Sequence, residues 1–420
     1  MNLKHLEKED NEIKMLIDEE LKRQQNTLEM IASENIVSEA VLEAAGSVLT
    51  NKYAEGYPKK RYYGGCEIVD KIEQLAIDRA CKLFGCKHAN VQPHSGSQAN
   101  FAVYMAFCKP GDTILTLDLS NYSHLTHGSP VNFSGKLFDI ETYKIRDDGY
   151  IDMEDFEKRL YEVHPKMVIT GTSAYPREID FAKYREIIDK YNENAKEKCL
   201  LWTDMAHIAG LVATGMHQSP IPYADVVTTT THKTLRGIRG GLILWNNDEY
   251  TKPINSAVFP TSQGGGLQHI IAAKAVGFKE AMQSDFKDYI STVVTNSKKL
   301  AETLTSRGFN LVTGGTDNHL ILIDLRNKGI TGKAAQDRLE NFGIAVNKNA
   351  VPNETEKPMI TSGIRLGTAA ITTRGMKEVE MVKIGNYIAD ILSAPESELG
   401  KLEYIKEEIR ALLGFFPIYE

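Results

Sequence analysis

The sequence predicts an α/β protein in which a mainly parallel sheet lies between helices, followed by a smaller α+β domain at the C-terminus. Between about residues 69 and 282, short apolar runs of strand length alternate with amphipathic stretches of helix length, as in parallel sheets with helical crossovers. After about residue 285, helical stretches are interleaved with separate strands. We therefore expect an N-terminal arm for packing or subunit contact at residues 1–55, a large domain at 56–284 and a small domain at 285–420.

Composition narrows the class of protein. The chain has 420 residues, 42% of them hydrophobic and 25% charged, which is enough for a large core. A net charge of -7 argues against a nucleic-acid or anionic-membrane surface. The five cysteines lack metal-ligand spacing, and neither a signal peptide nor an apolar run of transmembrane length is found. We expect a cytoplasmic protein with reduced thiols and no nucleic-acid, membrane or metal partner.

The N-terminal part combines an arm and an unusual loop. Ile13, Leu16, Ile17 and Leu21 have the spacing of an amphipathic helix. Residues 51–66 hold four tyrosines and three glycines around one acid, Glu55, and show neither helical nor strand periodicity. Aromatic-rich irregular segments of this kind are typical of binding loops, the alternative being a surface loop with structural tyrosines.

A candidate phosphate cradle follows. Residues 69–84 have helical periodicity, residues 88–93 form a short predicted strand, and a further helix begins at about Gln98. The turn between strand and helix contains Ser95, Gly96 and Ser97. Free N–H groups at a helix N-terminus and two hydroxyls suit an anion, although helix capping explains the same residues.

Polar residues follow the predicted strands in the same way. Strands are expected at 112–119, 166–172, 200–207, 226–231 and 240–245, with helices at 156–163 and 181–191 between them. Two histidines lie in the loop 120–129, and Ser173, Asp204 and His207 lie at strand ends. Because ligands of parallel sheets bind at the carboxyl ends of the strands, these side chains are expected to converge on one site.

Lys233 is the most informative of these residues. It follows the β-branched run 226–231 and precedes a loop with three glycines. Burial at the end of such a strand lowers the pKa of a lysine and makes a neutral amine available, which can hold an aldehyde cofactor as a Schiff base. The alternative is a solvated lysine at a strand end.

The remaining chain predicts a glycine-rich loop at 255–266, a helix at 268–282 and then the small domain. In that domain we expect helices at 290–307, from 331 and at 374–393, and strands at 310–313 and 319–324. Arg365 lies in the otherwise uncharged segment 360–368. A buried arginine usually meets a carboxylate, either of a structural acid or of a ligand.

These residues resemble the serine hydroxymethyltransferase family, pyridoxal-phosphate enzymes of the aspartate-aminotransferase fold (fold type I). The resemblance implies a large cofactor-binding domain with a seven-stranded type of sheet. The matching motifs, in chain order, are IASEN, NKYAEGYP, RYYGG, VQPHSGSQAN, HLTHGSPVNFSGK, SAYPR, DMAHIAGL, TTTTHKTLRG, TGGTDNHL, VNKN and TSGIR.

The resemblance also implies roles for single residues. Lys233 resembles the Schiff-base lysine, Asp204 the acid that keeps the pyridine nitrogen protonated, and His124 the histidine stacked on the ring; Glu55 is the fourth expected catalytic residue, an acid–base group near the substrate hydroxyl. The cofactor-binding residues implied are Ser95, Gly96, Ser97, His124, Ser173, Asp204, His207, Thr230, His232, Lys233, Gly264 and Gly265.

The implied substrate site binds serine or glycine, and the implied co-substrate is tetrahydrofolate. Arg365 resembles the clamp for the substrate carboxylate; the substrate-binding residues implied are Ser33, Tyr53, Glu55, Tyr63 and Arg365. The folate-binding residues implied are Leu119, Ser123 and Asn349. Because the family builds its site across a subunit interface, with Gly264 and Gly265 supplied by a neighbouring subunit, the resemblance implies a homodimer or a dimer of dimers.

One departure from the family pattern keeps alternatives open. Before the stacking histidine the family usually reads His-Gly-Gly, but this chain has Asn121, Tyr122 and Ser123, and a tyrosine in place of glycine adds bulk beside the expected folate. The first hypothesis is serine hydroxymethyltransferase activity; the second is a folate-independent threonine aldolase or L-threonine transaldolase. The third hypothesis is a non-enzymatic protein that binds RNA or serves as a scaffold. The acidic net charge gives it no support, and the retained Lys233 argues against it.

Overall fold

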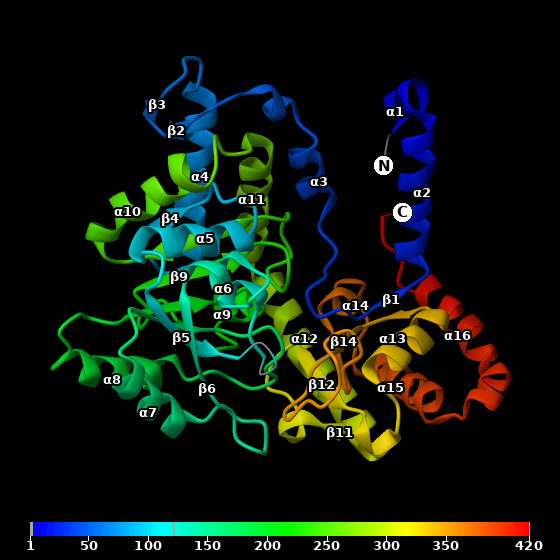
Figure 1. Ribbon diagram of the computed structural model, residues 1–420. Coiled ribbons are helices and arrows are strands. Elements are labelled where there is room, and N and C mark those ends of the chain that lie inside the picture. The colour runs from blue at the N-terminus through cyan, green and yellow to red at the C-terminus, as the bar shows by residue number, and fades with distance from the viewer. Residues whose placement is uncertain (1–2, 119, 121, 420) are drawn as a thin grey trace. The chain divides into compact units, whose positions relative to one another are not determined.

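The computed structural model describes residues 3–118, 120 and 122–419. It comprises two compact units: Asn35–Ser291 forms the first, and Met1–Glu34 together with Thr292–Glu420 forms the second. The N-terminal segment therefore belongs with the C-terminal part of the chain. Helix α12 (Ser284–Ser306) runs through the boundary (Figure 1). No helix among the described residues is long and apolar enough to span a membrane.

The first unit is built on a seven-stranded sheet with the strand order β4-β10-β9-β8-β7-β5-β6 (Figure 1). Its strands are β4 (His88–Asn90), β5 (Thr113–Leu117), β6 (Asp139–Tyr143), β7 (Met167–Thr170), β8 (Leu200–Asp204), β9 (Val226–Thr230) and β10 (Gly241–Trp245), and a separate hairpin joins β2 (Gly56–Tyr57) and β3 (Lys60–Arg61). Its helices include α3 (Glu39–Ala45), α4 (Glu67–Phe84), α5 (Gly96–Phe107), α6 (Phe133–Leu137), α7 (Met153–Val163), α8 (Phe181–Asn192), α9 (Ala209–Thr214), α10 (Thr251–Ser256) and α11 (Gln268–Ala281).

The expectation of a mainly parallel sheet is confirmed. Strands β6, β5, β7, β8 and β9 pair in parallel, whereas β10 is antiparallel to both of its neighbours, β4 and β9. Strand β6 was not predicted from the sequence. It lies at the edge of the sheet, and its residues Asp139–Tyr143 are mostly half-buried or exposed, so they lack the continuous apolar run that marks the central strands.

Helices cover both faces of this sheet. Ile169 and Trp202 are buried in a cluster with residues of α5. The preceding residues, Val168 and Leu201, are also fully buried and point to the opposite face, because side chains alternate along a strand. Helices α7 and α8 pack against β5, β6 and β8. The carboxyl ends of the central strands are therefore held rigidly in register, which positions the polar residues that follow them.

The second unit contains a four-stranded antiparallel sheet with the order β11-β12-β15-β14. Its strands are β11 (Asn310–Leu311), β12 (Leu320–Asp324), β14 (Asn347–Asn349) and β15 (Gly363–Gly367), and β1 (Leu28–Glu29) pairs in parallel with β13 (Ile344–Ala345). Its helices include α1 (Lys4–Glu9), α2 (Asn11–Gln25), α13 (Gly332–Asn341), α14 (Ala369–Thr373), α15 (Glu378–Ser393) and α16 (Tyr404–Gly414). Strand β15 is fully buried but was expected only as a polar segment, because Arg365 and two glycines interrupt its apolar residues.

Arg374 ties the two ends of the chain together inside the second unit. Its Nε donates to the carbonyl oxygen of Phe416 at 2.8 Å. Its Nη1 and Nη2 donate to the carbonyl oxygens of Gln24 at 3.1 Å and Gln25 at 3.0 Å. Burial lowers the pKa of the Arg374 guanidinium to about 10, so the group remains charged at neutral pH. One cation thus provides hydrogen-bond donors for backbone carbonyl oxygens in the last turn of α2 and after α16.

We expect Arg374→Met to lower the free energy of unfolding by about 2–4 kcal/mol, because buried carbonyl groups lose their donor. The matched control is Arg410→Met, which removes an exposed arginine paired with Glu407 at 2.6 Å on α16 and should change the free energy by no more than about 0.5 kcal/mol. Urea unfolding followed by circular dichroism measures both. Equal effects of the two substitutions would contradict the role assigned to Arg374.

Candidate active site

The strand ends of the first unit enclose a cavity of about 180 Å³. Asp204 is the last residue of β8, and Lys233 follows β9 by three positions. All the expected cofactor residues line this cavity except Gly264 and Gly265. The lining residues are Ser95, Gly96, Ser97, Asn100, His124, His127, Thr172, Ser173, Asp204, Ala206, His207, Thr230, His232, Lys233 and Arg239.

One wall of the cavity is the N-terminus of α5. Ser95 caps this helix, and its Oγ accepts a hydrogen bond from the Gln98 amide at 3.2 Å. A Cβ atom on Gly96 would lie 2.6 Å from Cγ2 of Thr230, so only glycine allows α5 to approach β9 this closely. Amide groups at the positive end of α5 and the hydroxyls of Ser95 and Ser97 make this wall suitable for a phosphate.

Lys274 of α11 supports this wall from behind. Its ammonium donates to three carbonyl oxygens, those of Val91 at 2.7 Å, Pro93 at 2.9 Å and Gly241 at 2.8 Å. These carbonyls belong to the segment after β4 and to the first residue of β10. Three acceptors use all three ammonium protons, although complete burial lowers the pKa of Lys274 to about 7. The lysine therefore fixes the segment that leads into Ser95.

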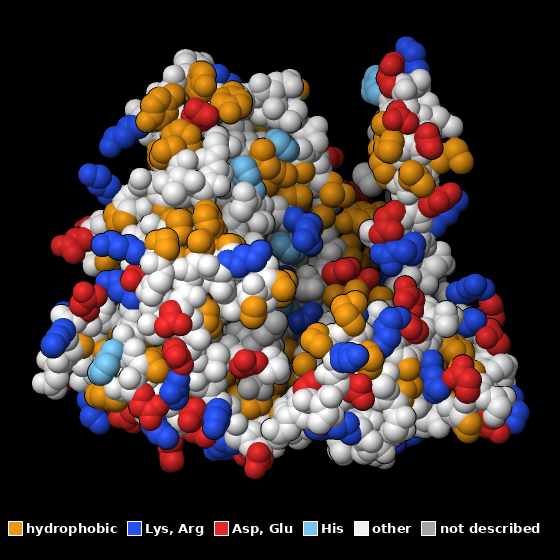
Figure 2. Space-filling view, viewed as in Figure 1, with side chains coloured by type: hydrophobic (Ala, Val, Ile, Leu, Met, Phe, Trp, Pro, Cys, Tyr) orange, Lys and Arg blue, Asp and Glu red, His pale blue; other side chains and the backbone are white. Residues whose placement is uncertain are grey.

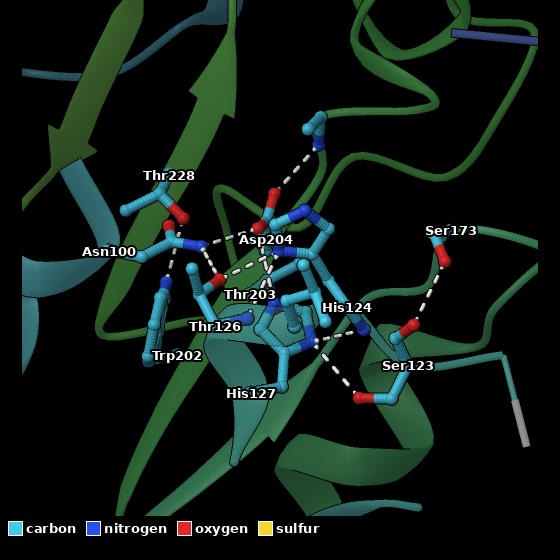
Figure 3. A network of polar contacts seen from close by, with 12 residues as sticks. Asn100, Ser123, His124, Thr126, His127, Ser173, Trp202, Thr203, Asp204 and Thr228 are labelled. Carbon is cyan, nitrogen blue, oxygen red and sulfur yellow. Dashed lines mark hydrogen bonds and ion pairs between the residues drawn. The ribbon is translucent and has the colours of Figure 1, made fainter. Parts of the chain in front are cut away.

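A second part of the cavity lining is organised around the carboxylate of Asp204 (Figure 3). Its Oδ2 accepts hydrogen bonds from Asn100 Nδ2 at 2.8 Å and lies 3.1 Å from Nε2 of His127. Its Oδ1 accepts from the Ala206 amide at 3.0 Å. Asn100 Nδ2 also donates to Thr126 at 2.7 Å. Asp204 is thus held by partners from α5, from the loop after β5 and from the turn that follows β8.

These contacts keep Asp204 ionised despite its burial. Burial raises the pKa of a carboxyl group, but the hydrogen bond and charge of His127, the charge of His124 and the amide of Asn100 more than offset this effect. The pKa of Asp204 therefore lies well below its ordinary value. A buried carboxylate that stays charged can hold a cationic N–H group of a ligand.

A metal ion is a weaker explanation of the same residues. His124, His127 and Asp204 carry ligand atoms that all lie within 4.8 Å of one another. The Oδ2 atom of Asp204 already accepts from Asn100 and meets His127, and Nδ1 of His124 lies 2.8 Å from the Thr126 hydroxyl. These hydrogen bonds account for the cluster as a device that positions the carboxylate.

Tyr122 points away from the cavity and does not line it. Its side chain is buried, its hydroxyl donates to the carbonyl oxygen of Gly149 at 2.8 Å, and its ring lies 5.3 Å from that of Tyr175. Its backbone has φ +73°, and its carbonyl oxygen accepts from the Ser173 amide at 2.7 Å. Ser173 Oγ also donates to the carbonyl oxygen of Ser123 at 2.9 Å. The tyrosine thus anchors the loop that carries Ser123 and His124.

Lys233 is fixed through its backbone. Its carbonyl oxygen accepts from Asn35 Nδ2 at 2.9 Å, and the same amide donates to the Tyr289 hydroxyl at 2.8 Å. The next residue, Thr234, donates its hydroxyl to the carbonyl oxygen of His207 at 2.9 Å. Lys233 is 9% exposed, which suits an amine that must react from a partly desolvated position.

The expected acid–base group lies in an aromatic cluster elsewhere in the first unit. The rings of Tyr53 and Tyr63 meet edge to face at 5.3 Å, and the hydrogen bond and charge of Glu55 raise the pKa of Tyr53. Gly264 and Gly265 lie beside this cluster, since a Cβ on Gly265 would lie 3.4 Å from Cγ of Glu55. In this chain the two glycines therefore face Glu55 of their own subunit.

The other expected residues lie in the second unit or outside the described residues. Arg365 is central in β15, buried, and donates from Nε to Asn347 Oδ1 at 3.1 Å. Asn349 is the last residue of β14 and is half-buried, as is Ser33. Leu119 and Asn121, the remaining positions of interest on the folate side, lie outside the described residues.

Two buried polar atoms of the cavity lining favour a ligand that bears an anionic group. Among the described residues, Thr230 Oγ1 and His232 Nδ1 are buried and have no hydrogen-bond partner. Both residues line the cavity with Ser95 and Ser97. Unsatisfied buried polar atoms are costly, so these two atoms favour a ligand that bonds them. An anion site, a buried carboxylate and an amine in one cavity match the phosphate, the ring nitrogen and the aldehyde of pyridoxal phosphate.

The family model described as serine hydroxymethyltransferase matches residues 6–388 of this chain. The chain belongs to the serine hydroxymethyltransferase family. Members of this family use pyridoxal phosphate and have fold type I, in agreement with the sheet and with the polar atoms of the cavity. The family assignment also makes the protein an enzyme of the one-carbon transferase or aldolase type.

Three residues that position the site were not among the expected site residues. His127 lies three residues after His124. The sequence places both histidines in one loop after a predicted strand but does not indicate that His127 contacts Asp204. Asn100 is buried in the largely apolar helix α5. A polar residue at such a position is the only feature of the sequence that could have indicated a role in the site. Lys274 is a lysine in a buried stretch of α11, but nothing in its sequence context identifies the carbonyl groups of distant strands as its partners.

His232 gives a prediction about pH. Burial, followed by the charges of Arg239, Lys233 and Lys274, lowers the pKa of His232 to about 3. The unfolded chain, with a histidine pKa of about 6.5, binds a proton in the intervening pH range that the folded protein does not, so stability falls as the pH falls through that range. His232→Gln should lose less thermal stability than the wild type between about pH 7 and about pH 5.

Differential scanning calorimetry of the cofactor-free protein measures this effect. His164→Gln is a suitable control, because it removes an exposed histidine that contacts the Tyr191 hydroxyl and does not line the cavity. Parallel curves for wild type and His232→Gln would show that His232 is protonated in the folded protein.

Proposed function

We propose that this protein is a pyridoxal-phosphate-dependent serine hydroxymethyltransferase, which interconverts serine and tetrahydrofolate with glycine and 5,10-methylenetetrahydrofolate. The observation that carries the proposal is the joint placement of Lys233, an ionised Asp204 and the α5 anion wall in one cavity. The family match supports the reaction class, and the retained Glu55, Tyr63 and Asn349 support the hydroxymethyl and folate specificity.

The cavity residues have distinct roles in this proposal. Bound pyridoxal phosphate supplies an electron sink for the electron pair released when a bond at the substrate α-carbon breaks. Asp204 holds the proton on the ring nitrogen, which keeps that sink strong, and His127 and Asn100 keep Asp204 ionised. Lys233 provides the amine that carries the cofactor between turnovers. Ser95 and Ser97, with the α5 amides, Thr230 and His232, bind the phosphate.

Two residues act on the substrate. Arg365 binds the amino-acid carboxylate, for which a buried guanidinium is suited by charge and by its paired donors. Glu55 takes the hydroxyl proton as the hydroxymethyl group leaves and returns it in the reverse reaction. The neighbouring Tyr53 hydrogen-bonds Glu55 and keeps its carboxylate oriented. Tetrahydrofolate accepts the one-carbon unit, so glycine remains.

A second candidate is a folate-independent threonine aldolase or L-threonine transaldolase. The observation that favours it is the loop before His124, where Tyr122 and Ser123 replace the glycines usual in the family. The side chain of Tyr122 is bonded to Gly149 and packed on Tyr175, and it is absent from the cavity wall. This orientation favours the hydroxymethyltransferase, because the added bulk is turned into the protein.

We also propose that the protein is a homodimer or a dimer of dimers. Hydrophobic side chains gather on the surface around β2 and β3 (Figure 2). Tyr62, 74% exposed, and Tyr63, 49% exposed, directly follow β3, and a cluster of exposed hydrophobic side chains is typical of a surface that contacts another protein. Sedimentation at several concentrations tests this assembly state.

The reaction is tested by supplying the cofactor-loaded protein with serine and tetrahydrofolate. We expect glycine and methylenetetrahydrofolate to form in equal amounts over many turnovers. Lys233→Ala should lose multiple turnover, because no amine remains to carry the cofactor, and borohydride should no longer fix the cofactor to the chain. Folate-independent cleavage of threonine to acetaldehyde, with no reaction of serine and folate, would support the second candidate. A Lys233→Ala protein with normal turnover would contradict the assignment of Lys233.

Tyr122→Phe separates an anchoring role from a role in the folate site. Loss of the hydroxyl leaves the buried Gly149 carbonyl without its donor, so we expect the free energy of unfolding to fall by about 1–2 kcal/mol. The KM for tetrahydrofolate should be unchanged, because the ring is turned away from the cavity. Tyr161→Phe, at a residue 42% exposed, is the control and should leave stability within about 0.5 kcal/mol. A lower KM for folate without loss of stability would show that Tyr122 faces the acceptor.

A further inference from the structure

A pair of cysteines lies outside the candidate active site, at the C-terminal end of α4. Gly85 ends this helix in the left-handed conformation with φ +71°. The amides of Gly85 and Cys86 both donate to the carbonyl oxygen of Cys81, at 2.9 Å and 3.2 Å. A helix end closed in this way brings the side chains on either side of the glycine into contact. In many helices the two residues at these positions are apolar, whereas here both are cysteines, Cys81 and Cys86.

The thiols of Cys81 and Cys86 interact directly. Each thiol is the largest influence on the pKa of the other, which places the two side chains close together, and the Cys86 sulfur lies 3.4 Å from the carbonyl oxygen of His88 at the start of β4. The hydrogen bond from Cys86 is the largest influence on Cys81 and lowers the pKa of its thiol, against the opposing effects of burial and of Asp78. Cys81 also lines a surface groove that Cys86 does not line, so Cys81 is the thiol of the pair that an oxidant from solvent meets first, and its thiolate is the reactive form.

Access distinguishes this pair from the other cysteines. Cys81 lines a surface groove of about 400 Å³ together with Lys87 and His88, and both thiols of the pair are half-buried. The other three are buried, with Cys66 at 6%, Cys108 at 9% and Cys199 at 1% exposure. Burial also raises the pKa of Cys108 and of Cys199 to about 12. Only the pair at the end of α4 combines a reactive thiol, a path from solvent and a second thiol in contact.

We propose that Cys81 and Cys86 form a redox modification site, which hydroperoxides oxidise to an intrachain disulfide. In the first step the Cys81 thiolate attacks a peroxide oxygen, the O–O bond breaks, and hydroxide or alkoxide leaves and takes up a proton. In the second step the Cys86 sulfur attacks the resulting sulfenic acid, the S–O bond breaks, and water leaves. Two thiols are oxidised by two electrons in total, and one hydroperoxide is reduced. A dithiol reductant reverses the modification by exchange.

The fold favours the disulfide over further oxidation. The two sulfurs are already neighbours, and the backbone around Gly85 is closed by hydrogen bonds in the reduced protein. Bond formation therefore needs little backbone movement, which is the usual obstacle to a disulfide. The bridge would fasten the end of α4 to the residues before β4. Rapid capture by Cys86 also protects Cys81 from irreversible oxidation.

The experiment uses hydrogen peroxide on the wild-type holoenzyme. After peroxide is removed with catalase, free thiols are alkylated under denaturing conditions and the protein is digested with trypsin. Cleavage after Lys82 separates Cys81 from Cys86, so the disulfide appears as two peptides, Ala80–Lys82 and Leu83–Lys87, joined by one bond. We expect this linked pair to accumulate and to disappear on reduction, while Cys66, Cys108 and Cys199 remain alkylated as before.

Two serine variants identify the attacking thiol. In Cys86→Ser the hydroxyl retains a hydrogen-bond donor, no disulfide can form, and a sulfenic-acid trap should label Cys81. Labelling of Cys86 in Cys81→Ser should be about tenfold weaker or less, because Cys81 lines the surface groove and Cys86 does not. Cys66→Ser is the matched control and should behave as the wild type. The proposal is wrong if Cys81 stays fully alkylatable after peroxide, or if wild-type Cys81 proceeds to sulfinic acid without the linked peptide.

Discussion

The candidate active site depends on one buried charge, the carboxylate of Asp204. Burial alone would favour the neutral form of this group, and a neutral acid could not fill the role proposed for Asp204, which is to hold a proton on the ring nitrogen of the cofactor. Hydrogen bonds from Asn100, His127 and the Ala206 amide keep it ionised. These partners come from α5, from the loop after β5 and from the end of β8, so the charge requires the whole central sheet to be in register. The polar network is therefore a product of tertiary packing as much as of local sequence.

Close approach between backbone segments is the second constraint. The strand ends must converge within a few ångströms to surround a small cofactor, and side chains would prevent this at two positions. A Cβ on Gly96 would meet Thr230 at 2.6 Å, and a Cβ on Gly171, where φ is +103°, would lie 1.9 Å from the carbonyl oxygen of Asp204. Lys274 then lies behind the anion wall and donates to three carbonyl oxygens of the segment after β4 and the start of β10. Small residues and one buried cation thus allow the site to be compact.

The loop before His124 shows how a departure from a family pattern can be accommodated. At the position where the family usually has glycine, Tyr122 keeps a positive φ, which glycine adopts at little cost and tyrosine does not. Burial of its ring against Tyr175 and its hydrogen bond to Gly149 offset that cost. The same residue accepts the Ser173 amide, so it supports the cavity from outside. A bulky substitution beside an expected ligand therefore need not occupy the ligand's space.

The sequence alone determined the fold class, the strand ends that carry Lys233 and Asp204, and the residues of the anion wall, because buried strands and helix N-termini leave local signals within a few residues. Edge strand β6 and the buried strand β15 escaped prediction, because one lacks an apolar run and the other contains Arg365. Only the tertiary structure decided which way Tyr122 points, that Asn100, His127 and Lys274 support the site, and that Arg374 joins the two ends of the chain. Those interactions link residues far apart in sequence, and side-chain direction and hydrogen-bond partners depend on the packing of both segments. Local patterns thus locate reactive groups, and long-range packing sets their charge and orientation.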